Sequence, residues 1–143
     1  MKTKIILSIS FILLLFISCD TSKKEAIDIK SIKIEGVNLD NSERWQANKE
    51  TTEGVIKMQT ILNDFSKTAS TEEYKTLKID LEGAFSEVFQ KCTMKGESHN
   101  QLHNYLKPML PMFDALESMD SKVREKNYDI LGMHLMGYIN YFE

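Results

Sequence analysis

The stretch that decides the fold is residues 70–92, STEEYKTLKIDLEGAFSEVFQKC. Its apolar residues recur at intervals of three and four, which places them on one face of an α-helix. They are Tyr74, Leu77, Leu81, Phe85, Val88, Phe89 and Cys92. Ser70 or Thr71 is suited to the N-cap, and the acidic Glu72 and Glu73 favour the first turn. The pattern therefore predicts a long helix with one buried face.

The same spacing on either side of this stretch predicts three further helices. The apolar stripe before it is Val55, Met58, Ile61, Leu62 and Phe65. The first stripe after it is His99, Leu102, His103, Leu106, Met109, Leu110 and Phe113. The last stripe is Val123, Asn127, Leu131, His134, Tyr138 and Tyr141, in a helix that begins near Asp120 or Ser121. Short loops between four helices predict an all-α fold, an antiparallel up-down four-helix bundle.

The third predicted helix has distinct start and break signals. Ser98 followed by Gln101 has the form of a capping box, so we expect this helix to start at Ser98. Pro108 and Pro111 each remove a backbone donor and must kink or interrupt the helix.

The bundle is predicted to span residues 42–143, after a tether and an extended segment in residues 19–41. The polar residues 20–26 are typical of a linker. Residues 27–39 alternate in part between apolar and polar, as a strand would. A lone strand is not stable, so we expect extended chain that packs against the domain.

The first 18 residues have the organisation of an export signal. Lys2 and Lys4 precede an apolar run over residues 5–17, which is too short for a comfortable membrane span. The run ends at Ser18-Cys19. The segment Leu15-Phe16-Ile17-Ser18-Cys19 resembles the lipobox of bacterial lipoproteins, although Phe16 stands where leucine is commonest. The resemblance implies cleavage before Cys19, acylation of Cys19, and stable attachment to a membrane of the cell envelope, outside the cytoplasm.

Removing residues 1–18 would leave 125 residues, the length of one domain. The removed segment has two lysines and no acidic residue, so the net charge changes from −3 to −5. An acidic chain without a basic stripe is a poor candidate for a nucleic-acid-binding protein. We therefore expect no nucleic-acid partner.

If Cys19 is acylated, Cys92 is the only free thiol of the chain. His99 and His103 are four residues apart and share a helix face. In an antiparallel hairpin that turns near residue 95, Cys92 lies level with His99. A turn near residue 120 places His134 level with about residue 106. The spacing thus predicts that Cys92 and all three histidines converge near one end of the core.

This set of side chains predicts a site for copper or zinc. Thiolate is a soft donor that selects Cu(I), and imidazole binds copper and zinc alike. Paired histidines at i and i+4 offer two nitrogens to one ion, although the catalytic glutamate of His-Glu-x-x-His is replaced by Asn100. The predicted ligands are Cys92, His99, His103 and His134, with Met94 or Met109 as accessory sulfur donors.

The run from Cys92 to His103, Cys-Thr-Met-Lys-Gly-Glu-Ser-His-Asn-Gln-Leu-His, is similar to a motif in small uncharacterised helical lipoproteins exported by bacteria. The similarity covers about a dozen residues and implies no function. The metal hypothesis therefore depends on the residue spacing alone.

Other interpretations stay open. A lone cysteine is often buried as a small hydrophobe, and histidines or methionines on an apolar face are often core residues. The main alternative is a non-catalytic interaction module that binds another envelope protein. Its pliable apolar surface would comprise Met119, Met133, Met136 and Tyr141. Enzymatic activity is not expected, because no nucleophile–base–orienter set, phosphate-binding loop or di-iron motif is evident. The haem attachment motif is also missing.

Overall fold

The structure, a computed structural model, describes residues 27–143. The predicted signal segment 1–18, the predicted lipidation site Cys19 and the predicted tether 20–26 lie outside the described residues. The described chain contains the α-helices α1 Lys49–Asn63, α2 Thr71–Lys91, α3 Gly96–Leu106, α4 Met109–Ala115 and α5 Ser121–Met136. Two short 3-10 helices flank them, η1 Ile29–Ser31 and η2 Gly137–Asn140.

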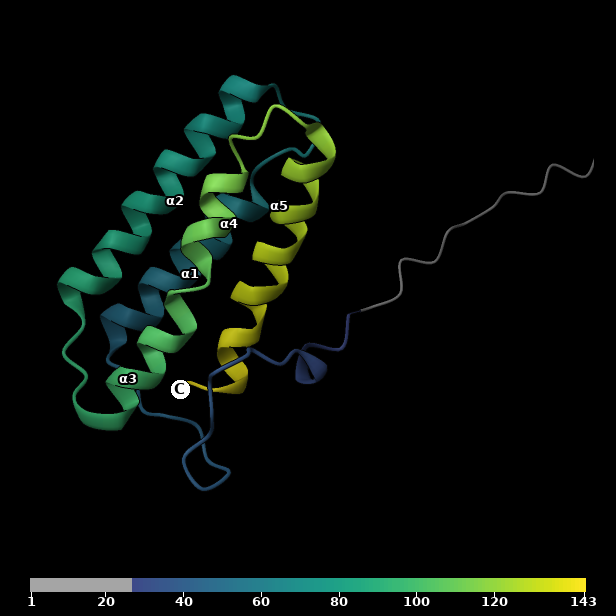
Figure 1. Cartoon of the computed structure of the whole chain (residues 1–143). Coiled ribbons are helices and arrows are strands. Elements are labelled where there is room, and N and C mark those ends of the chain that lie inside the picture. The colour runs from purple at the N-terminus through teal and green to yellow at the C-terminus, as the bar shows by residue number, and fades with distance from the viewer. Residues whose placement is uncertain (1–26) are drawn as a thin grey trace, which may run out of the picture.

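The helices form an antiparallel up-down bundle with four limbs (Figure 1). α1 packs most extensively against α2, and α5 packs against both α4 and α1. α3 and α4 together make the third limb. The predicted all-α bundle is therefore confirmed for residues 27–143. None of the helices in this part of the chain is long and apolar enough to cross a bilayer.

The break in the third limb lies where the prolines predicted it. α3 ends at Leu106, Pro108 is the N-cap of α4, and α4 begins at Met109. Pro111 lies in the first turn of α4, where a backbone N–H has no partner within the helix. One predicted helix is thus two, because Pro108 interrupts the hydrogen-bond ladder and Pro111 does not disturb the next one.

Two of the three predicted helix starts are confirmed. Ser70 caps α2 in a reciprocal capping box with Glu73, and the Asp120 side chain accepts from the N–H of Lys122 at the start of α5. The prediction that Ser98 caps the third helix is wrong. α3 begins two residues earlier, at Gly96, whose φ of +64° is a conformation that glycine adopts readily. The Ser98 hydroxyl donates instead to the Lys95 carbonyl, at 3.0 Å.

The core lies between the four limbs of the bundle. On one side of it, α1 and α2 pack very close together. A Cβ added at Gly54 would lie 2.4 Å from Val88 Cγ2, so only glycine fits this crossing without a shift. The largest fully buried side chains are Tyr74, Tyr105, Phe113, Phe142, Met58, Leu81, Leu102, Leu106, Met109, Leu116, Leu131 and Leu135.

Residues 27–39 form no strand with the rest of the described chain, and part of the segment is the 3-10 helix η1. As predicted, the segment packs against the domain: Ile34 and Val37 are buried. The Ile34 N–H donates to the Tyr141 hydroxyl at 2.9 Å, and the Asn38 N–H donates to Gln101 Oε1 at 2.8 Å. The segment therefore reaches both α3 and the residues after α5.

The chain just before α1 is paired with the residues that follow η2. Trp45 N–H donates to the Tyr141 carbonyl at 2.8 Å, and Glu143 N–H donates to the Trp45 carbonyl at 2.9 Å. Ala47 N–H donates to the Glu143 carbonyl at 2.8 Å. These bonds form a short parallel pairing that holds the two ends of the helical domain together.

Candidate functional site

The connection between α2 and α3 is positioned by Asn48, the residue that precedes α1. Asn48 Nδ2 donates to the Lys91 carbonyl at the end of α2, and its Oδ1 accepts from the Thr93 N–H, both at 3.1 Å. These bonds fix the backbone on both sides of Cys92. The thiol is thereby held beside the first turns of α3.

Three of the predicted site residues lie together at this corner. Cys92 Sγ is 3.6 Å from His99 Nδ1, and His99 Nε2 is 3.0 Å from His103 Nε2. His99 therefore lies between the other two and contacts each through a different ring nitrogen. A neutral His99 that donates Nδ1–H to sulfur keeps the lone pair of Nε2 directed at His103.

The outer side of this Cys92–His99–His103 cluster is open. His103 is exposed, and Cys92 and His99 are half-buried. Phe89, with 41% of its surface exposed, contacts the His103 ring edge-on at a centroid distance of 5.3 Å. The apolar spacing predicts a buried Phe89, but the structure leaves this side chain exposed beside His103.

Glu97 is the acidic side chain in the first turn of α3. Its carboxylate accepts from Gln101 Nε2 at 2.7 Å and from Asn100 Nδ2 at 3.1 Å, and these bonds lower the pKa of Glu97. The Glu97 carboxylate is thus hydrogen-bonded to side chains of its own helix.

His134 does not belong to the cluster. Its Nε2 lies 2.7 Å from the Tyr105 carbonyl oxygen, and the Tyr105 hydroxyl donates to the His134 carbonyl at 3.3 Å. The register prediction, which placed His134 level with residue 106, was thus close. The side chain nevertheless bonds the backbone of α3 from within the core, where only 6% of the residue is exposed. Burial lowers the pKa of His134, and the bond to Tyr105 opposes part of this effect.

This burial predicts a pH-dependent stability. The pKa of His134 is lower in the folded protein than in the unfolded chain, where histidine has a pKa of about 6.5. The stabilisation is therefore complete above about pH 6.5 and is lost as the pH falls toward the folded pKa. We expect urea unfolding at pH 7.5 and 5.5 to show a smaller pH-dependent loss for His134→Gln than for the wild type. Equal losses in the two proteins would contradict this assignment.

The two methionines predicted as accessory donors differ in exposure. Met109 is fully buried in the core, and Met94 is half-buried and packs against the core. Within residues 27–143, no group of three or more histidine, cysteine, aspartate or glutamate side chains is arranged to hold one metal ion. The cluster therefore offers a pair of imidazoles with a neighbouring thiol, and not a complete ligand cage.

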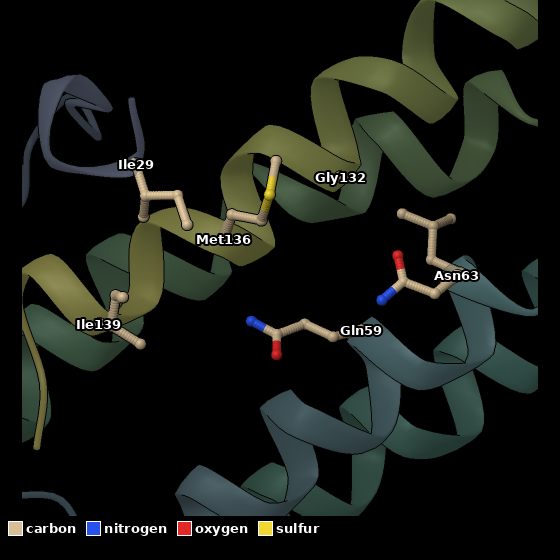
Figure 2. A pocket seen from close by; sticks show the side chains of 7 residues that line it. Ile29, Gln59, Asn63, Gly132, Met136 and Ile139 are labelled. Carbon is tan, nitrogen blue, oxygen red and sulfur yellow. The ribbon is translucent and has the colours of Figure 1, made fainter. Parts of the chain in front are cut away.

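A groove that shares no residue with this cluster lies between α1 and α5 (Figure 2). Its volume is about 270 Å³, and its lining is Ile29, Gln59, Leu62, Asn63, Gly132, Met136 and Ile139. Met136 and Ile139 come from the α5–η2 side and Gln59 from α1, as Figure 2 shows. None of the lining residues is titratable, and most of the lining is apolar.

The chain matches no family model, and no curated protein or solved structure shows significant similarity to it.

Proposed function

We propose that this chain is an envelope protein, anchored through a lipid on Cys19, that binds a zinc or copper ion at His99 and His103. The observation that carries the metal proposal is the separation of 3.0 Å between the two Nε2 atoms. Two nitrogens bound tetrahedrally to one zinc ion lie about 3.3 Å apart, given metal–nitrogen distances of about 2.05 Å. The separation in the structure is therefore within about 0.3 Å of the spacing that one ion requires.

Cys92 has a positioning role in this proposal. Histidines that bind metals commonly use one ring nitrogen for the ion and donate the other N–H to a fixed acceptor. Cys92 Sγ lies in this acceptor position, 3.6 Å from His99 Nδ1. The sulfur thus holds the His99 ring in the orientation that presents Nε2 to the ion.

A competition titration of the purified full chain in detergent, with a chromophoric chelator and Zn(II) or Cu(I), tests the proposal. Losing an acceptor behind a metal-bound histidine costs about 10–100-fold in affinity, so losing the ligand itself costs roughly 100-fold or more. We expect this loss for His103→Gln and a loss of about tenfold for Cys92→Ala. A bound ion should also raise the melting temperature of the wild type.

His134→Gln is the matched control. His134 bonds the backbone within the core, so its replacement should leave the metal affinity unchanged. A loss of affinity in His134→Gln as large as that in His103→Gln would instead favour a three-histidine site. Wild-type and His103→Gln proteins of equal affinity would rule out the proposed pair.

The second candidate function is the non-catalytic module that binds another envelope protein. It is favoured by the exposed Met133 and Ile139, 40% and 51% exposed, close to the groove between α1 and α5. Tyr141, which the sequence placed in this surface, is buried instead. A chain that binds neither ion would leave this candidate as the remaining proposal.

A further inference from the structure

The proposed metal pair has an unfilled side. Zinc in proteins is almost always bound by four ligands, and a helical pair supplies two. In the described part of the chain no third histidine, cysteine or carboxylate is placed to complete the set. The Glu97 carboxylate, in the first turn of α3, already accepts hydrogen bonds from the Gln101 and Asn100 side chains.

The His103 side of the pair is exposed. His103 is exposed on α3, and the exposed Phe89 of α2 lies against the edge of its ring. A second protein molecule can therefore approach the His103 imidazole without displacing core residues. Phe89 would supply apolar contact area beside the ion, of the kind that aromatic residues provide in protein interfaces.

We infer that two copies of this chain share one zinc ion, each copy contributing His99 and His103. The inference rests on the proposed metal pair and names the partner that completes it. A two-fold axis through the ion makes the contact isologous, the commonest symmetry of soluble oligomers, and gives four nitrogens, in two symmetry-related pairs, for a tetrahedral shell. The two Phe89 side chains then flank the ion from opposite copies. The site is incomplete in one copy and complete in two.

Sedimentation equilibrium of the purified full chain, in detergent matched to the solvent density, tests this inference. We expect the mass of one chain without metal and of two chains with zinc sulfate. Equilibrium dialysis should give one zinc ion per two chains. A chelator should restore the single-chain mass. His103→Gln should stay at the mass of one chain in the presence of zinc, whereas His134→Gln should dimerise as the wild type does.

The outcomes separate this inference from the proposed function. One zinc ion per chain at the mass of one chain overturns the shared site and leaves the metal pair standing, with water in the open positions. No bound zinc overturns the shared zinc site, and a chain that also fails to bind Cu(I) in the competition titration overturns the metal pair as well. A dimer that forms without zinc, or that persists in His103→Gln, shows that another surface joins the copies and also overturns the shared site.

Discussion

Replacing Cys19 by serine should abolish acylation of the chain completely. The acyl groups of a lipoprotein are carried by the thiol of the cysteine that follows the lipobox and, after cleavage, by its amino group. A serine hydroxyl does not replace that thiol, so neither acylation nor the cleavage that follows it should occur. Growth of an expressing bacterium with an alkyne-labelled fatty acid should label the wild type and leave Cys19→Ser unlabelled, with residues 1–18 retained in its mass.

Cys92→Ser is the control for this experiment. Cys92 is half-buried beside His99 and lies far along the chain from the lipobox, so its replacement should leave labelling unchanged. A labelled Cys19→Ser protein, or loss of the label in Cys92→Ser, would refute lipid attachment at Cys19.

Tyr105→Ala should cost about 3–5 kcal/mol of the free energy of unfolding, the range for large buried aromatic side chains. Tyr105 has no exposed surface, and its ring contacts those of His134, Tyr138 and Phe142. The truncation leaves a cavity where α3 meets α5 and the residues after it. Urea unfolding followed by circular dichroism measures the change.

Tyr105→Phe separates the ring from the hydroxyl. This variant loses one hydrogen bond, to the His134 carbonyl at 3.3 Å, and should cost about 1 kcal/mol. Equal losses for the two variants would show that the hydroxyl, and not ring packing, stabilises this contact. A loss below about 1 kcal/mol for Tyr105→Ala would contradict its place in the core.

The sequence predicted the helices well where periodicity and capping agreed. In α2 the apolar spacing and the Ser70–Glu73 pair indicate the same start, and both are present. At α3 two start signals conflict. Ser98 is a residue type that commonly caps helices, but Gly96 can adopt a positive φ, which lets the helix begin earlier. Local composition cannot decide between two such starts, because the packing of the preceding loop contributes to the choice.

The sequence predicted only part of the candidate site. The proximity of Cys92 to His99 and of His99 to His103 followed from the turn and the i, i+4 spacing. The spacing did not predict how the helix is rotated about its own axis, because Tyr105 fits the buried face as well as His103 does. In the structure Tyr105 is buried and His103 is exposed. His134 therefore meets the carbonyl of Tyr105 instead of the imidazole of His103.

The pairing of Trp45 and Ala47 with residues 141–143 has a mechanical consequence. When the chain is pulled from upstream of residue 27 while its C-terminal residues are held, tension that breaks the contacts of Ile34 and Asn38 reaches Trp45 before it reaches α1. Three backbone bonds transmit the load at this point directly to Tyr141 and Glu143. The helices between these residues form a closed loop outside the main path of tension. They should stay folded under traction until the three bonds rupture in shear.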